Sequence, residues 1–265
     1  MRPFIFVLAV TLIGCSTDDG TENSISIKKG DTAIFAYSDD LTDQSEEIKM
    51  ITEDCPNTAF LVGKIDIDNS SLVKISTNHG RSGIRLDSTV YEAFIRMSAS
   101  ANKNGINLYI ISAFRSFDYQ KGIWERKWEL NKALDDSSRA RKILEYSSMP
   151  GISRHHWGTD IDLNNLENSY FDSGIGLEIF NWLQLNAGDF GFYQPYTSKV
   201  DGRTGFEEEK WHWSYFPLSD KYLKYYSQDD EISDYINGFN GHHFYQDFDL
   251  LSEYVQGVAS SPKLN

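Results

Sequence analysis

The sequence has few cysteines and no excess of basic side chains. Cys15 and Cys55 are the two cysteines among 265 residues, and 25 Lys and Arg residues stand against 39 Asp and Glu residues. Two cysteines cannot build a disulfide framework. A formal charge of −14 leaves no surplus of cations to pair with phosphate groups, which argues against a nucleic-acid partner.

The chain begins with an apolar run that is too short to cross a bilayer. This run, residues 4–13, follows Arg2 and precedes Gly14 and Cys15, a pattern typical of an export signal. The segment 12–15 (LIGC) resembles the lipobox of bacterial lipoproteins. The resemblance implies cleavage before Cys15, lipidation of its thiol, and a protein exported to the bacterial cell envelope and anchored to a membrane by lipid. An ordinary signal peptide with an incidental cysteine is the alternative.

The rest of the composition is that of a globular protein. Hydrophobic residues make up 40% of the chain, aromatic residues 14% and charged residues 24%. We find no internal repeat and no low-complexity block. We therefore divide the chain into a signal peptide at 1–14, a tether and lead-in at 15–45, and one α+β domain at 46–265 with a helical, aromatic tail.

Hydrophobic periodicity and capping residues predict how helices and strands alternate within this domain. Helices are expected to start near Asp87–Thr89, after Ser116 with an inner face that includes Tyr119, and near Asp172–Ser173. Strand-like patterns cover 60–75, 108–111, 159–164, 192–193 and 211–215. In the strand at 159–164, alternation places Asp160 and Asp162 on the same face.

Two segments combine histidine with an acidic residue. In 153–162 (SRHHWGTDID), His155 precedes Asp162 by seven positions, and Glu209 precedes His212 by three. Two imidazoles and one carboxylate can hold zinc and leave one coordination position for water. A further glutamate could then take up and return protons beside that water. From these residues alone, hydrogen-bonding groups in a protein that binds no metal are the more common alternative.

Spacing alone leaves two choices open. His155 and His156 are adjacent, and in a strand or extended loop they point to opposite sides, so only one of them can easily be a ligand. Glu207 and Glu208 precede Glu209 and are competing candidates for the proton-transfer role.

Three segments in order resemble the zinc D-alanyl-D-alanine carboxypeptidases and dipeptidases of the VanY/VanX type, peptidase family M15. Residues 153–162 resemble the family signature S-x-H-x-x-G-x-A-x-D, residues 209–212 (EKWH) resemble E-x-W-H, and residues 112–120 (SAFRSFDYQ) resemble S-x-Y-R-S-x-x-x-Q. Asp160 departs from the family because it replaces the common alanine, and Phe114 replaces a tyrosine. If Asp160 faced the metal together with Asp162, the ligand set or substrate preference could change.

The resemblance implies a Hedgehog/DD-peptidase-like α+β domain whose small antiparallel sheet carries the zinc site between flanking helices. It implies that Zn²⁺ is held by His155, Asp162 and His212. It selects Glu209 as the general base.

The resemblance also implies that Arg115 contacts the substrate carboxylate or stabilises the oxyanion at the scissile carbonyl. Gln120 and Ser153 would then be partners of the terminal carboxylate. The function expected is that of a membrane-tethered zinc carboxypeptidase that removes the C-terminal D-Ala from peptidoglycan stem peptides. The alternatives are an L,D-carboxypeptidase or D,D-dipeptidase on the same scaffold, or a non-catalytic lipoprotein that binds the cell wall.

Overall fold

The computed structural model describes residues 56–262. The expected signal peptide at 1–14, the lipidated Cys15, the tether and Cys55 lie outside this range. Within it, no helix has both the length and the apolar character that crossing a membrane requires.

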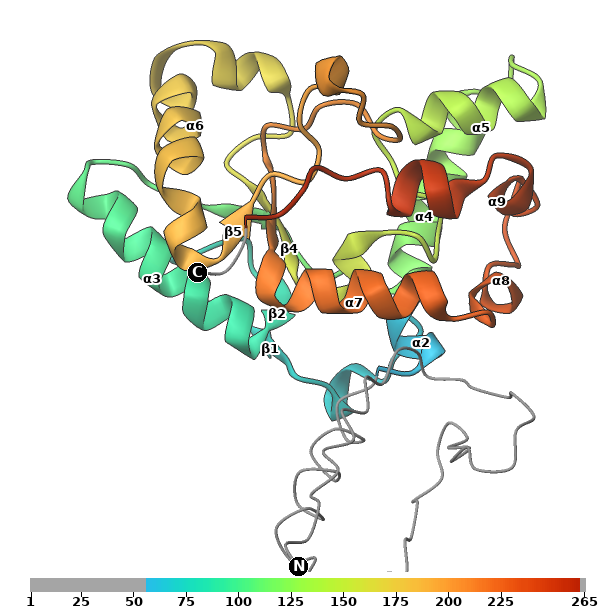
Figure 1. Cartoon of the computed structure of the whole chain (residues 1–265), viewed down its shortest axis with the longest axis horizontal. Coiled ribbons are helices and arrows are strands. Elements are labelled where there is room, and N and C mark those ends of the chain that lie inside the picture. Colours follow the sequence, from blue (N-terminus) through green and yellow to red (C-terminus); the bar gives the residue numbers. More distant parts are fainter. Residues whose placement is uncertain (1–55, 263–265) are drawn as a thin grey trace, which may run out of the picture. The chain divides into compact units, whose positions relative to one another are not determined.

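Helices and short strands alternate along the described part of the chain (Figure 1). The helices are α2 Thr58–Leu61, α3 Ser88–Lys103, α4 Phe117–Leu130, α5 Asp136–Leu144, α6 Gly174–Asn186, α7 Phe216–Gln228, α8 Ile232–Tyr235 and α9 Phe244–Asp247. The strands are β1 Leu72–Lys74, β2 Arg85–Asp87, β3 Ile110–Ser112, β4 Asp160–Leu163, β5 Phe192–Tyr193 and β6 His212–Tyr215. Short 3-10 turns include η2, Arg154–Trp157, and a single π-helical turn covers Leu251–Val255.

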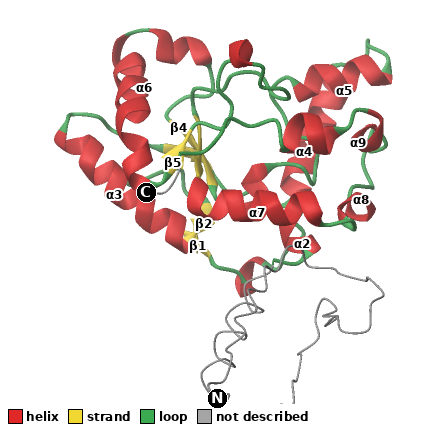
Figure 2. Cartoon of the chain, in the orientation of Figure 1, coloured by secondary structure: helices red, strands yellow, loops and turns green. Residues whose placement is uncertain are grey.

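A four-stranded antiparallel sheet with the order β3-β4-β6-β5 lies at the centre, among the helices (Figure 2). A separate antiparallel pair joins β1 to β2. The α+β class and the small antiparallel sheet flanked by helices are therefore confirmed. In the register of β4 and β6, Asp162 pairs with His212 and Asp160 pairs with Ser214.

Two hydrophobic clusters flank this sheet. One packs α3 and α6 against the strands and includes Ile161 and Leu163, which are fully buried. The other joins α2, α4, α5 and α7 to the aromatic C-terminal residues, with Trp124 at its centre. Because Ile161 and Leu163 point into the first cluster, the alternating Asp160 and Asp162 point away from it, as the sequence predicts.

Polar side chains cap the N-termini of α3, α4 and α5. The Asp87 side chain accepts hydrogen bonds from the backbone N–H groups of the first turn of α3, and Ser116 and Asp135 cap α4 and α5 in the same way. Asp87 and Ser116 are both among the predicted caps. Pro217 lies in the first turn of α7, where its missing N–H leaves no hydrogen bond unmade.

Some details of the predicted pattern are wrong. Residues 58–61 form helix α2 instead of a strand, since Asn57 caps a helical turn there. Tyr119 is 64% exposed, and its neighbour Gln120 is buried in its place. Leu185, in the helix that starts near the predicted Asp172–Ser173, is 83% exposed despite its apolar side chain. In each case, hydrophobic side chains alone did not determine which residues are buried or which element forms. Capping and the packing of the whole helix determined it.

Candidate metal centre

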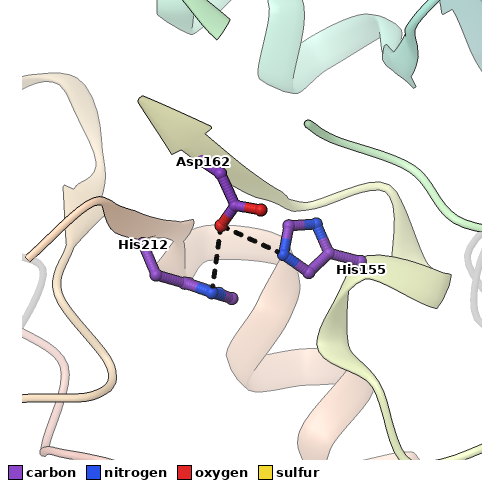
Figure 3. A group of neighbouring side chains, drawn as sticks. All are labelled: His155, Asp162 and His212. Atoms are coloured by element: carbon purple, nitrogen blue, oxygen red, sulfur yellow. Dashed lines mark ion pairs between the residues drawn. The ribbon is translucent and has the colours of Figure 1, made fainter. Parts of the chain in front are cut away.

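The three predicted ligands come together from three elements. His155 lies in η2, Asp162 in β4 and His212 in β6, and one potential ligand atom of each lies within 4.8 Å of the others (Figure 3). The pairing of Asp162 with His212 across the two strands brings these two side chains side by side. All three residues are buried.

The distances from Asp162 to the two imidazoles match those between ligands of a tetrahedral ion. Asp162 Oδ1 lies 3.3 Å from His155 Nε2 and 3.4 Å from His212 Nδ1. Ligands about 2.0–2.1 Å from a tetrahedral zinc ion are about 3.3 Å from one another. Asp162 Oδ1 is also buried without a hydrogen-bond partner, which is unusual for a carboxylate oxygen. A cation at this point would satisfy it.

Hydrogen bonds distinguish His155 from His156. His155 Nδ1 lies 2.7 Å from the carbonyl oxygen of Ala113, to which it donates, so Nε2 is left free to face Asp162. His156 uses both ring nitrogens in the framework. Its Nε2 accepts from the Gly151 N–H at 3.0 Å, and its Nδ1 donates to the Arg115 carbonyl at 2.6 Å. Of these two histidines, only His155 can therefore serve as a metal ligand.

The two histidines diverge because they lie in a 3-10 turn and not in the predicted extended segment. The turn ends at Gly158, whose φ of 70° is a left-handed conformation that glycine adopts without strain. A second glycine makes room for His156: a Cβ on Gly63 would lie 2.4 Å from His156 Nδ1. Burial lowers the pKa of His156 to about 3, so its ring is neutral.

Glu209 is the acidic residue beside the three ligands. Its Oε2 lies 3.2 Å from His212 Nδ1, and only 6% of the residue is exposed. Burial raises the pKa of Glu209 above its usual value, which suits a group that must take up and release a proton. Glu207 forms an ion pair with Lys199 at 2.7 Å, and neither Glu207 nor Glu208 lines the cleft that Glu209 faces.

Asp160 lies behind His212 and does not join the ligand set. Its Oδ1 is 2.9 Å from His212 Nε2, whereas Asp162 lies beside the other ring nitrogen, Nδ1. Burial opposes a charge on His212, but hydrogen bonds to Asp160 and Glu209 outweigh it and raise the pKa of His212 to about 9 in the metal-free protein. The extra aspartate therefore supports a ligand and does not add one.

Arg115 is held directly against the ligands. Its Nη2 donates to Asp162 Oδ2 at 2.5 Å and lies 3.0 Å from His155 Nε2. Its Nη1 donates to Gln120 Oε1 at 3.3 Å. Gln120 is fully buried and donates in turn to the Ser148 carbonyl, so it positions Arg115.

A cleft of about 1100 Å³ opens onto this centre. Ser153, Arg115, Glu209 and the three ligands all line it, so it brings together every predicted site residue of the domain except Gln120. Lys127 also lines the cleft and was not predicted; its ammonium donates to Ser147 Oγ at 2.5 Å. Lys127 lies seven residues after Gln120 and therefore on the same face of α4, and this spacing could have identified it as a cleft residue from the sequence.

Three potential ligands beside an acidic group and an open cleft are the arrangement that a metal-dependent hydrolase requires, since a structural zinc site is usually closed by a fourth protein ligand. The family model described as "VanY: D-alanyl-D-alanine carboxypeptidase" matches residues 83–218, just over half of the chain. The chain belongs to this family.

Individual relatives agree with the family. A D-alanyl-D-alanine carboxypeptidase of Enterococcus faecalis is 28% identical over 160 residues, which cover 58% of this chain and 57% of that protein. The putative carboxypeptidase YodJ of Bacillus subtilis is 30% identical over 126 residues, covering 47% of this chain and 44% of the relative. The chain thus spans about half the length of these curated relatives. A solved structure of a vancomycin-resistance D,D-pentapeptidase VanY mutant with Zn(II) has 24% identity and a TM-score of 0.47, covering 58% of this chain and 83% of that one.

Proposed function

We propose that this protein is a zinc-dependent carboxypeptidase that removes the C-terminal D-Ala from peptidoglycan stem peptides. The observation that carries the proposal is the buried Asp162 Oδ1, which has no hydrogen-bond partner and lies 3.3 and 3.4 Å from the two imidazoles. The membership of the VanY family supports the substrate class. The cleft beside the ligands has room for a peptide end.

His155, Asp162 and His212 would hold the zinc ion through Nε2, a carboxylate oxygen and Nδ1. When bound, zinc supplies a Lewis acid that polarises a carbonyl group and makes a water molecule more acidic. Glu209 takes a proton from the attacking water as its oxygen bonds to the scissile carbonyl carbon. When the C–N bond breaks, Glu209 returns that proton to the departing amine of D-Ala.

The guanidinium of Arg115 stabilises the negative charge that develops on the carbonyl oxygen. It is a fixed cation, held by Ser112 Oγ at 3.0 Å and Gln120 at 3.3 Å, and it already lies beside the ligands. A donor fixed before the reaction loses little free energy to reorientation when charge develops. Ser153, which lines the cleft, would bind the terminal carboxylate of the substrate.

The test is to incubate the purified protein with pentapeptide and tetrapeptide muropeptides and to identify the products by mass spectrometry. We expect loss of one D-Ala from the pentapeptide, abolished by a zinc chelator and restored by added zinc. Release from the tetrapeptide alone would indicate an L,D-carboxypeptidase, and release of a dipeptide would indicate a dipeptidase. Binding to peptidoglycan without any cleaved product would contradict an enzymatic function.

We also propose that the protein is exported and anchored to a membrane of the cell envelope through lipid on Cys15. The support is the basic residue, short apolar run and LIGC segment at residues 2–15. Expression in a bacterial host with labelled palmitate should label the wild-type chain and leave Cys15→Ser unlabelled. Equal labelling of both, or of neither, would contradict the lipid anchor.

A further inference from the structure

Asp160 is a fully buried carboxylate, and every hydrogen bond it accepts comes from a buried neighbour. Its Oδ1 accepts from Arg154 Nε at 3.1 Å and from His212 Nε2 at 2.9 Å. Its Oδ2 accepts from Thr159 Oγ1 at 2.6 Å and Ser214 Oγ at 3.1 Å. A buried carboxylate requires this number of partners, because leaving water removes its solvation.

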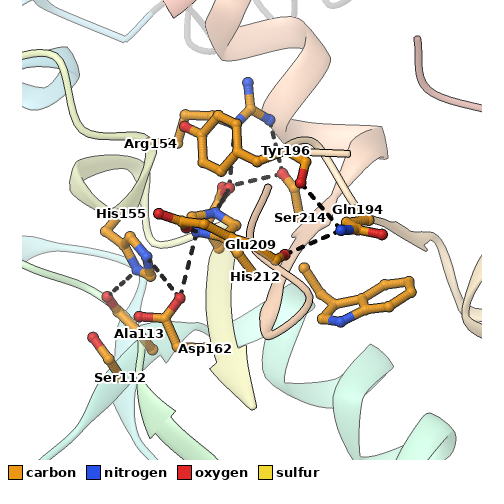
Figure 4. Close-up of polar contacts among 12 residues, drawn as sticks. Ser112, Ala113, Arg154, His155, Asp162, Gln194, Tyr196, Glu209, His212 and Ser214 are labelled. Carbon is orange, nitrogen blue, oxygen red and sulfur yellow. Dashed lines mark hydrogen bonds and ion pairs between the residues drawn. The ribbon is translucent and has the colours of Figure 1, made fainter. Parts of the chain in front are cut away.

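Arg154 supplies the opposite charge. Arg154 and Asp160 are both 0% exposed, and Arg154 Nη2 also donates to Ser214 Oγ at 2.7 Å (Figure 4). The guanidinium lies over the ring of Trp157, with its central carbon 4.9 Å from the ring centroid. Arg154 has no contact with the cleft. Arg154 therefore serves here as the counter-charge of the Asp160 carboxylate.

The arrangement fixes the orientation of one metal ligand. Because Asp160 Oδ1 accepts the proton on His212 Nε2, the other nitrogen, Nδ1, faces Asp162 and Glu209. Without Asp160, that N–H would be a buried donor without a partner, and the ring could rotate to find one. Ser214 directly faces Asp160 on the neighbouring strand β6, two residues after His212, which makes the support rigid.

We propose that Asp160 is a positioning residue for metal binding, with Arg154 as the counter-charge that allows a carboxylate where the family signature has alanine. The two residues act as one unit that holds His212 with Nδ1 toward the ion. This inference rests on the metal site proposed above. It adds to that site a specific pair outside the ligand set, through which this chain departs from the family pattern.

The experiment measures zinc affinity of the full chain by competition with a chromophoric chelator. Asp160→Ala should weaken zinc binding by about 10–100-fold, the usual effect of removing a hydrogen-bond partner of a histidine ligand. The matched control is Asp87→Ala, since Asp87 is also a buried aspartate that accepts hydrogen bonds but caps helix α3 and contacts no ligand. Its zinc affinity should stay within about twofold of the wild type, whatever its stability.

A second variant guards against misfolding. Asp160→Ala alone leaves the buried Arg154 guanidinium without its counter-charge. The double variant Arg154→Met with Asp160→Ala removes both charges and restores the alanine of the signature. We expect the double variant to fold and to lose zinc affinity by the same factor. In both variants the absorption bands of the Co²⁺-substituted protein should shift, because the His212 ring is no longer held in one orientation.

Two results would overturn the inference. One is zinc affinity and a Co²⁺ spectrum in Asp160→Ala that match the wild type. The other is a loss in Asp160→Ala that the double variant fully restores, because the stranded arginine would then be its cause. A wild-type chain that binds no zinc would instead reject the metal site itself, so the two failures are distinguishable.

Discussion

The two sides of the His212 imidazole differ in how completely their aspartate oxygens are paired. On the Nε2 side, both Asp160 oxygens accept hydrogen bonds from buried donors. On the Nδ1 side, Asp162 Oδ1 has no hydrogen-bond partner and Glu209 faces an open cleft. The two aspartates are two residues apart on one strand and share the same face.

This contrast indicates which of two similar carboxylates is chemically active. The Nε2 side is structural, because both oxygens of Asp160 already accept hydrogen bonds and neither is left to bind an ion. The unpaired side has an acceptor that folding does not satisfy, which is expected where an ion completes the structure. Variants on the two sides should therefore differ in kind. On the Nδ1 side, replacing Glu209 should lower turnover and replacing a ligand should abolish metal binding, whereas replacing Asp160 on the Nε2 side should weaken metal binding without abolishing it.

The largest effect is expected from Glu209→Gln, which keeps the shape of the side chain and removes its capacity to accept a proton. Turnover should fall by about 10²–10⁴-fold, while zinc content stays at the wild-type level. Glu207→Gln is the matched control, because Glu207 is two residues away and pairs with Lys199 outside the cleft. Steady-state kinetics and metal analysis measure both, and comparable turnover in the two variants would contradict the assignment of Glu209.

Arg115→Met should lower kcat by about 10²–10³-fold, the usual effect of removing a donor that stabilises an oxyanion. Zinc affinity should not fall, since the positive charge of Arg115 lies against Asp162 and His155, where it opposes the binding of a cation. Arg139→Met, on α5 and paired with Asp136, controls for loss of a positive charge. A variant that loses zinc together with activity would show that Arg115 holds the ligands in place.

The prediction from sequence succeeds where a residue type and an offset determine geometry. Alternation in β4 predicts Asp160 and Asp162 on one face, and the structure places both against His212. Capping predicts the start of α3 and α4 from Asp87 and Ser116. These features depend on neighbours in sequence, so a single chain is sufficient to find them.

Contacts between distant segments could not be predicted where the family motifs do not imply them. The role of Asp160 depends on Arg154 in η2 and Ser214 in β6, and no local pattern indicates that the three meet. The burial of Gln120 in place of Tyr119 follows from the contacts of its amide with Arg115 and Ser148. A hydrophobic pattern favours the tyrosine because it contains no information about these polar partners.

His156→Leu should affect stability and not chemistry. The leucine leaves the Gly151 N–H and the Arg115 carbonyl without the partners they have now, each buried polar group costing about 1–3 kcal/mol. Urea unfolding should show a corresponding fall in the free energy of unfolding, with zinc affinity of the folded protein within a few-fold of the wild type. By contrast, His155→Leu should abolish zinc binding. An equal loss of zinc affinity in both variants would contradict the assignment of His155 as the ligand and His156 as a structural residue.

The charge on the His212 ring should make zinc binding depend on pH. In the metal-free protein the pKa of His212 is raised to about 9, so the ring is protonated below that pH, and Nδ1 must lose its proton before it can bind an ion. Affinity should therefore rise by about tenfold per pH unit up to pH 9 and then level off. The pKa values of His155 and Asp162 are lowered, so neither contributes a proton at pH 7. Calorimetry in buffers of different ionisation enthalpy should report one proton released per zinc ion at pH 7. A binding enthalpy that does not depend on the buffer would show that His212 is already neutral at pH 7. Asp160 would then orient the His212 ring without keeping it protonated.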